Sequence, residues 1–147
     1  NLRSNRLKEI PDEMGALVRL NRLNLAHNHL ERRLPDHLGL LTGLTDLDLS
    51  DNNIGHLPPS LGALEDLETL DVSKNVLATL PQNFAFLTSL TDLDLSCNRF
   101  KDLPLLLCEM STLRKLDMTS NVVCHLPRDV VTLTKLTKLH LRHNLLR

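Results

Sequence analysis

Acidic side chains alternate with leucine in short segments of this chain and are its main source of chemistry. The pairs Asp46/Asp48 and Asp92/Asp94 each flank a single leucine. Paired carboxylates can serve as a general acid and base or as ligands for a cation. Their alternation with leucine predicts short strands that bury the leucine and turn the carboxylates to water. Because an open, hydrated strip does not raise a carboxylate pKa far enough for acid catalysis, we expect no enzyme here.

Histidine and cysteine do not complete a site either. The seven histidines are scattered along the chain. His27 and His29 lie two residues apart, as a metal pair on a strand would, but no cysteine or group of three carboxylates accompanies them. The sequence has no Cys-x-x-Cys motif and no glycine-rich loop that would hold a phosphate. We therefore expect no catalytic residue, no metal, no cofactor and no small-molecule substrate.

The amino-acid composition of the chain limits the classes of molecule that it could bind. The net charge of -1 argues against a nucleic-acid binder, which usually carries a basic excess. No apolar run approaches the roughly 18 to 20 residues of a membrane span. Three scattered cysteines and no Asn-x-Ser/Thr site do not resemble a secreted repeat protein with cysteine-rich caps. These features favour a cytoplasmic protein with protein partners, and no nucleic-acid or membrane partner.

The elements that carry these residues repeat along the chain. Asparagines recur every 23 residues, with one interval of 24, at Asn5, Asn28, Asn52, Asn75, Asn98, Asn121 and Asn144. A proline follows six of them, at Pro11, Pro35, Pro58, Pro81, Pro104 and Pro127. A fixed period of this length predicts a stacked solenoid. Leucine supplies 38 of the 147 residues, which is typical of one packing position copied many times.

One unit, residues 90–112, shows the expected structure of all. Leu90, Leu93 and Leu95 predict a short strand with one buried face. Asn98 follows where the chain turns, and its amide can donate to and accept from loop backbone. Pro104 is suited to the first turn of a helix, and the later apolar residues have helical spacing. We expect parallel strands centred near residues 22, 46, 69, 92, 115 and 138.

The unit Leu-x-x-Leu-x-Leu-x-x-Asn-x-Leu-x-x-Leu-Pro resembles the 23-residue leucine-rich repeat of intracellular signalling scaffolds. It is similar to the repeats of the Shoc and Ras-suppressor proteins and of Scribble and Erbin. The resemblance covers the whole chain and implies an α/β fold, a curved horseshoe segment with parallel strands on the concave face and short helical or 3₁₀ segments on the convex face. It also implies a function in binding other proteins. We expect residues 1–147 to form a single solenoid of about seven repeats. Because the first and last repeats are partial, we expect a fragment of a longer chain.

Outward-facing strand residues are the candidates for binding a partner on the concave face. They are Asp46, Asp48, Thr69, Asp71, Asp92, Asp94, Lys115, Asp117, Lys138 and His140. Residues 44–95 carry nine acidic side chains and one basic, for a net charge of -8, whereas residues 96–147 carry a net charge of +5. This distribution predicts a centrally acidic surface that binds a basic partner. Asp48, Asp71, Asp94 and Asp117 form a column on adjacent strands, and a second interpretation is that each of their carboxylates bonds locally.

Two departures from the repeat are also candidates for function. One extra residue lies between Asn28 and Pro35, and loop insertions of this kind are usually tolerated without a role. Phe86, Leu105 and Leu106 replace small or polar residues and predict an apolar patch on the lateral or helical face. That patch would hold a partner or cover a flank or an adjoining domain. Three hypotheses follow: a signalling scaffold that binds on its concave face, a structural component of a cytoskeletal or ciliary type of assembly, and the regulatory domain of a signalling enzyme.

Overall fold

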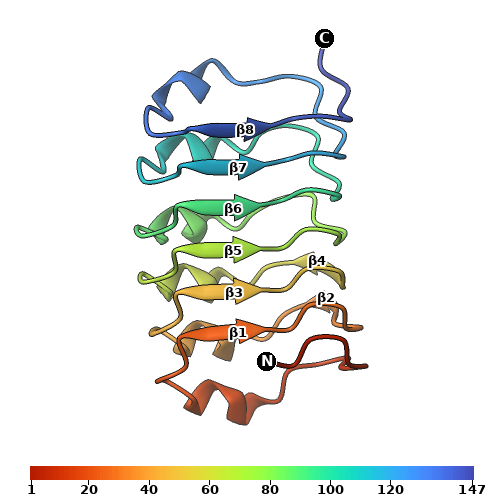
Figure 1. Ribbon diagram of the computed structural model, residues 1–147, viewed down its shortest axis with the longest axis vertical. Helices are drawn as coiled ribbons and strands as arrows, with labels where there is room; N and C mark the ends of the chain where they lie inside the picture. The colour runs from red at the N-terminus through yellow and green to blue at the C-terminus, as the bar shows by residue number, and fades with distance from the viewer.

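The computed structural model describes the backbone of residues 1–147 and every side chain except those of residues 32 and 33. The chain forms a single stack with its termini at opposite ends (Figure 1). Six strands pair in parallel in the order β1-β3-β5-β6-β7-β8. Their bounds are β1 (Arg22–Asn24), β3 (Asp46–Asp48), β5 (Thr69–Asp71), β6 (Asp92–Asp94), β7 (Lys115–Asp117) and β8 (Lys138–His140). The expected parallel solenoid is confirmed, and each strand is centred one residue later than expected, on its buried leucine.

Short 3₁₀ helices return the chain on the opposite side of the stack. They are η1 (Asp12–Ala16), η2 (Asp36–Leu40), η3 (Pro59–Ala63), η4 (Gln82–Phe86), η5 (Leu105–Glu109) and η6 (Arg128–Thr132). Each begins directly after one of the six repeated prolines. The proline carbonyl accepts the N–H of the third residue on, as Pro58 does from Leu61 at 3.0 Å. Proline therefore fixes where every helical turn starts.

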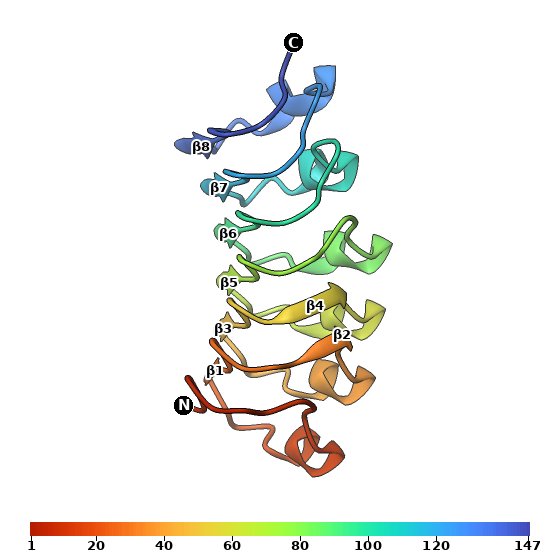
Figure 2. The ribbon, with the colours of Figure 1, turned by 90° about the vertical axis from the view of Figure 1, so that its right-hand side faces the viewer.

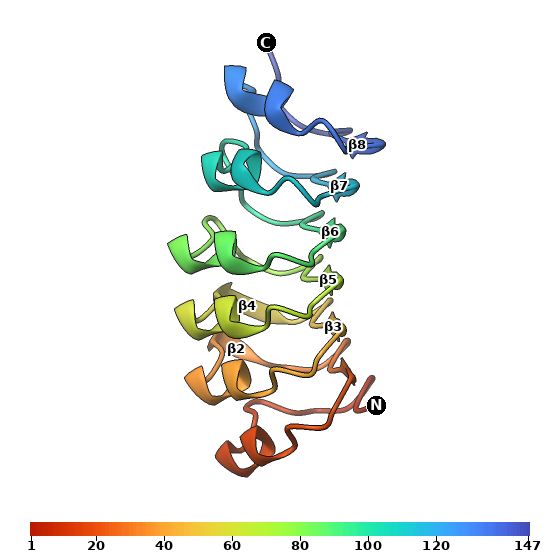
Figure 3. The ribbon, with the colours of Figure 1, turned by 90° about the vertical axis from the view of Figure 1, so that its left-hand side faces the viewer.

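Strands and 3₁₀ helices occupy two separate sides of the solenoid. Figures 2 and 3 show the strands on one side, the helices on the other, and a stack that is taller on the helical side. This difference in height makes the sheet the concave face. Between the two sides lies one continuous core, built from leucines that stack in register, such as Leu70, Leu93 and Leu116. Each repeat thus buries its apolar face against its neighbours.

The repeated asparagines connect each repeat to the preceding one by hydrogen bonds. Asn75 is buried, and its Oδ1 accepts the N–H of Ile54 at 2.9 Å. Its Nδ2 donates to Leu49 O at 3.0 Å in the preceding repeat and to Val72 O at 3.1 Å in its own. The residue before each of the seven asparagines adopts a φ between 53° and 57° and none is glycine. The predicted bonding of asparagine to loop backbone is present in every repeat.

The extra residue after Asn28 lies in a second, smaller sheet. Here β2 (Glu31–Arg33) pairs in parallel with β4 (Asn53–His56). The pairing register shifts between residues 32 and 33. A local irregularity in one strand is how sheets commonly accommodate one residue too many. The main sheet therefore keeps its register from β1 to β3.

Candidate functional site

The outward residues of the main sheet form two rows that cross all six strands. The first strand position contributes Arg22, Asp46, Thr69, Asp92, Lys115 and Lys138, paired in register. The third position contributes Asn24, Asp48, Asp71, Asp94, Asp117 and His140. All ten concave-face candidates therefore lie on one surface. They line two adjoining depressions, one over β1, β3 and β5 and one over β5 to β8.

The aspartates of the third position each bond to their own backbone. One Oδ1 atom accepts the N–H two residues further along at Asp48, Asp71, Asp94 and Asp117, over 2.8 to 3.0 Å. This is the Asx turn, which Asp forms readily where a strand ends. Local bonding thus accounts for one oxygen of each carboxylate. The partner of the second carboxylate oxygen differs from strand to strand.

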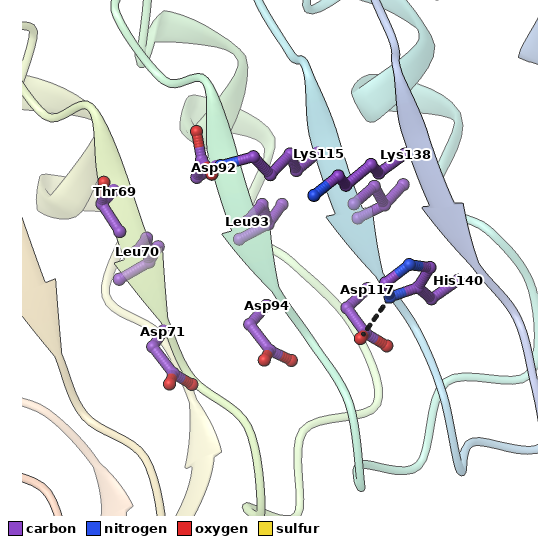
Figure 4. A pocket seen from close by; sticks show the side chains of 11 residues that line it. Thr69, Leu70, Asp71, Asp92, Leu93, Asp94, Lys115, Asp117, Lys138 and His140 are labelled. Carbon is purple, nitrogen blue, oxygen red and sulfur yellow. Dashed lines mark hydrogen bonds and ion pairs between the residues drawn. The ribbon is translucent and has the colours of Figure 1, made fainter.

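Oppositely charged side chains on neighbouring strands neutralise part of the surface. Lys115 forms an ion pair with Asp92 across β6 and β7. His140 Nδ1 lies 2.9 Å from Asp117 Oδ2. Figure 4 marks this contact with a dashed line. Burial acts to raise the pKa of Asp92, but hydrogen bonds from Lys115 and Thr91, with the charges of Lys115 and Lys138, lower it overall. The pKa of Asp117 is also lowered, because bonds to Thr119 and His140 outweigh its burial.

The depression over β1, β3 and β5 is neutralised in the same way. Arg22 Nε lies 3.3 Å from Asp46 Oδ2. Asn24 Nδ2 donates to Asp48 Oδ2 at 2.8 Å, and Arg3 Nη1 lies 4.0 Å from the same oxygen. Two of the acidic candidates therefore already have partners within the chain.

Asp71 and Asp94 remain with unmatched charge in the middle of the sheet. They are direct neighbours across β5 and β6. Among the side chains that the structure describes, neither has a cationic partner. Burial raises the pKa of Asp71, and the charges of Asp94 and Asp48 add to this rise, while bonds from Ser73 oppose it. The central acidity predicted from sequence is thus concentrated at these two carboxylates.

The pairs that neutralise the surface were not foreseen from sequence, although the signal was present. Asp92 and Lys115 are separated by one repeat length, as are Asp117 and His140. In a parallel solenoid, one repeat length places two residues side by side on adjacent strands. Comparing charges at this offset, rather than summing them over segments, finds each pair.

The proposed lateral patch is only partly exposed. Phe86 and Leu105 are each 61% exposed, whereas Leu106 is partly buried and packs against the core. Phe86 ends η4 and Leu105 begins the adjacent η5. Two of the three residues are therefore accessible to a partner, and they lie at opposite ends of neighbouring helices.

Histidine side chains contribute ion pairs and hydrogen bonds to the surface. His27 Nδ1 pairs with Asp51 and its Nε2 lies 2.7 Å from Arg3 Nη2. Within the described residues, no group of three or more His, Cys, Asp or Glu is placed to hold a metal ion. The same residues include no helix with the length and hydropathy needed to cross a membrane.

Comparison with known proteins agrees with this architecture. Residues 36–142 match the model of a leucine-rich repeat region, and residues 1–54 match that of a leucine rich repeat. The chain belongs to the leucine-rich repeat family. Leucine-rich repeat folds are generally protein–protein interaction modules and are typically non-enzymatic. No curated protein matches the chain in sequence.

Solved structures of other leucine-rich repeat proteins are similar over nearly the whole chain. A leucine-rich repeat protein of Leptospira interrogans has a TM-score of 0.94 and 32% identity, covering 97% of this chain and 36% of its own. The ectodomain of the plant membrane receptor kinase GASSHO1/SCHENGEN3 from Arabidopsis thaliana has a TM-score of 0.83 and 34% identity, covering 94% and 17%. The leucine-rich repeat domain of the type III effector XopL has a TM-score of 0.88 and 27% identity, covering 97% and 51%. The chain thus spans about a third of the Leptospira protein and less of the plant receptor.

Proposed function

We propose that this leucine-rich repeat chain is a non-enzymatic module that binds a basic segment of another protein on its concave sheet. The supporting observation is the adjacent pair Asp71 and Asp94, which has no cationic partner among the described side chains. Like charges opposed across strands are unfavourable by roughly 0.2 to 1 kcal/mol. A lysine or arginine of a partner would relieve this repulsion, so the pair favours a basic ligand over an acidic one.

Similar solved structures support a protein or peptide partner. The plant peptide hormone receptor RGFR1 was solved in complex with RGF2, PEPR1 with AtPEP1, and GASSHO1/SCHENGEN3 with CASPARIAN STRIP INTEGRITY FACTOR 2. By analogy, we propose that the partner of this chain presents an extended segment. The chain has no Trp or Tyr to serve as an anchor. Affinity would then come from charge and many modest contacts, and it would fall as salt screens exposed pairs over about 8 to 10 Å.

We further propose that the module acts as a scaffold in cytoplasmic signalling. The support is the resemblance of its 23-residue unit to the repeats of intracellular scaffolds, together with three unpaired cysteines at Cys97, Cys108 and Cys124. Unpaired thiols are the usual state of cysteine in a reducing compartment. A regulatory role beside a signalling enzyme would use the same concave surface.

The test removes the two charges without disturbing the turns they stabilise. Changing Asp71 and Asp94 to lysine would remove the Oδ1 acceptors of the Ser73 and Ser96 N–H groups as well as the charge. The double variant Asp71→Asn with Asp94→Asn keeps an acceptor at each position. The matched control is Glu65→Gln with Asp66→Asn, which removes the same charge from exposed residues outside both depressions.

The probe is a fluorescein-labelled peptide of alternating lysine and serine, blocked at both ends, and the readout is fluorescence anisotropy. We expect the Asp71/Asp94 variant to bind about three- to tenfold more weakly than the wild type and the control variant to bind as the wild type does. The difference should shrink as salt rises. Equal binding by all three proteins would contradict the proposed concave site.

Exposure of Phe86 and Leu105 favours a second candidate function, a structural component held by its lateral face. Proximity labelling in cells separates the two. Loss of labelled partners in the Asp71/Asp94 variant supports the concave site. Retention of those partners, with loss in Phe86→Asp, supports the lateral one.

A further inference from the structure

The depression over β5 to β8 contains charges of both signs that form no ion pair with another described side chain. It is lined from both rows of the sheet, from Thr69 on β5 to His140 on β8. Two of its carboxylates are matched, Asp92 by Lys115 and Asp117 by His140. With those pairs set aside, its unmatched groups are the carboxylates of Asp71 and Asp94 and the ammonium of Lys138.

Lys138 is unmatched because its cross-strand neighbour is another lysine. It pairs in register with Lys115, whose ammonium forms an ion pair with Asp92. Lys138 is exposed and extends from β8 toward β7 (Figure 4). It forms no ion pair with a carboxylate among the described side chains, and its charge acts on Asp92 only at longer range. An anion placed there would meet Lys138 directly and lie close to a second lysine. A cation placed there would be repelled.

The spacing of these groups matches an extended peptide that runs along the solenoid axis. Adjacent strands lie about 4.8 Å apart, so Asp71 and Asp94 are separated by about 5 Å along the axis, and Asp71 and the Lys138 backbone by about 14 Å. Lys138 belongs to the first-position row, which lies two residues, or about 7 Å, across the sheet from the row of Asp71 and Asp94. In an extended peptide, residues i, i+2 and i+4 share one face and lie about 6.6 Å and 13 Å along the chain. Long, flexible lysine side chains, of the peptide and of Lys138, span the differences of about 2 Å along the axis and the offset between the two rows.

We infer that the ligand of this surface is a dipolar peptide segment with the pattern basic-x-basic-x-acidic, or the same pattern reversed. The inference rests on the proposed function and adds the sign and spacing of the ligand's charges. The two basic side chains lie over Asp71 and Asp94, and the carboxylate of the Asp or Glu lies over Lys138. A uniformly basic ligand would place a cation against Lys138 and lose this contact.

Three labelled peptides, acetylated and amidated so that their termini carry no charge, test the pattern in an alanine and serine background. One is Lys-x-Lys-x-Glu, one is Lys-x-Lys-x-Gln, and one is Lys-x-Lys-Glu, in which Glu falls on the opposite face. The first peptide should bind about two- to fivefold more tightly than the other two. General attraction to a chain of net charge -1 would favour the Gln peptide, so the predicted order cannot arise from net charge.

Lys138→Gln should abolish the advantage of Lys-x-Lys-x-Glu, whereas Lys135→Gln, an exposed lysine outside the depression, should preserve it. Equal affinity of the Glu and Gln peptides, with the Asp71/Asp94 variant still weakening both, would overturn the dipolar inference and leave the proposed function standing. Equal affinity of the two Glu peptides would overturn the i+4 spacing. If the Asp71/Asp94 variant binds every peptide as the wild type does, the proposed function and this inference both fail.

Discussion

At the scale of the residue, one aspartate position serves both the fold and the surface. In Asp71 and Asp94, Oδ1 closes a turn by accepting a backbone N–H. The charge on each carboxylate also interacts with the residue one repeat away in the same row. His140 pairs with Asp117, whereas the row neighbours of Asp71 are Asp48 and Asp94, and those of Asp94 are Asp71 and Asp117. Identical local structure therefore gives different surface chemistry on different strands.

The first residue-scale prediction concerns stability against pH. The pKa of Asp71 is raised above its ordinary value of 3.8, by burial first and then by the charges of Asp94 and Asp48. Ionised Asp71 therefore lowers the free energy of unfolding, fully so above the folded pKa. This penalty shrinks as pH falls through the folded pKa and is gone below the unfolded value of 3.8. Asp71→Asn should raise the free energy of unfolding at pH 7 by roughly 0.2 to 1 kcal/mol. Urea unfolding at pH 7 and pH 3 measures the gain, which should vanish at pH 3.

Asp117→Asn is the matched comparison and should act in the opposite direction. The pKa of Asp117 is lowered because its bonds to Thr119 and His140 outweigh burial. Its stabilisation is complete above 3.8 and is lost as pH falls through the lower folded pKa. The Asn variant should therefore be less stable than the wild type at pH 7. A loss of stability at pH 7 in Asp71→Asn as well would show that the turn, rather than the charge, dominates at both positions.

Sequence alone predicts which residues reach this surface but not which of them stay unpaired. The period-2 alternation of leucine predicts the two rows, since a strand turns successive side chains to opposite faces. Which charges form ion pairs depends on how far each side chain reaches across the strands. Asp92, for example, forms its ion pair with Lys115 rather than with Lys138. Partial burial of Leu106 likewise depends on packing between helices, which a single repeat does not show.

At the scale of the element, the 3₁₀ helices differ in how closely they pack. The fourth residue after each proline is Gly15, Gly39, Gly62, Ala85, Cys108 and Val131 along the chain. A Cβ atom at Gly62 would lie 2.2 Å from the carbonyl oxygen of Asn83 in the next repeat. At Gly39 the same distance, to Ser60 O, would be 2.3 Å. Glycine at these positions lets η2, η3 and η4 pack directly backbone to backbone.

Gly62→Ala should therefore destabilise the solenoid. The added methyl group meets backbone, which cannot rotate away as a side chain would, so η3 and η4 must separate. We expect a loss of about 1 to 3 kcal/mol in the free energy of unfolding, the usual effect of overpacking. Urea unfolding at neutral pH provides the measurement.

Gly15→Ala is the control for this packing prediction. Its nearest atoms would lie 3.2 Å away, and one of them belongs to the mobile end of the Leu40 side chain. The cost should be clearly smaller than at Gly62. Equal costs at the two glycines would mean that loss of glycine itself, rather than close approach, decides stability.

The helices also show how far sequence predicts an element. Proline at a fixed position predicts where each turn starts, because its fixed φ suits a first helical residue. The apolar spacing predicts helical structure without distinguishing α from 3₁₀, since both bury one face in so short a segment. The 3₁₀ form and the close glycine contacts depend on the neighbouring repeat.

At the scale of the whole molecule, each repeat is stabilised by its neighbours. The shared leucine core and the hydrogen bonds of the repeated asparagines, here called the asparagine ladder, connect them. Asn98 accepts from Leu77 N at 2.9 Å and donates to Val72 O at 3.0 Å, both in the preceding repeat. Each inner asparagine repeats this arrangement. A solenoid held by nearest-neighbour contacts behaves approximately as a one-dimensional chain of coupled units. Weakening the contacts between two central repeats should then let the two halves of the molecule unfold independently, rather than destabilise all repeats equally.

Asn75→Ala tests this division. The change leaves the buried Ile54 N–H without its side-chain acceptor. The Leu49 and Val72 carbonyls each lose one of two side-chain donors and keep the bonds from Asn52 and Asn98. An unsatisfied buried backbone group costs about 1 to 3 kcal/mol, so we expect a loss of that size in the free energy of unfolding. Hydrogen exchange followed by mass spectrometry should show residues 1–72 and 76–147 opening at different rates in this variant, whereas the wild type opens as one unit.

Asn5→Ala provides the comparison at the same position of the first repeat. Asn5 is exposed, and its Nδ2 donates only to Leu2 O at 2.9 Å and Arg3 O at 3.2 Å within its own repeat. Since these carbonyls are open to water, their loss should cost less than about 1 kcal/mol and leave exchange in the rest of the chain unchanged. If Asn75→Ala instead lowers protection uniformly from residue 1 to residue 147, the repeats fold as a single cooperative unit. The ladder would then stabilise that unit as a whole rather than couple its two halves.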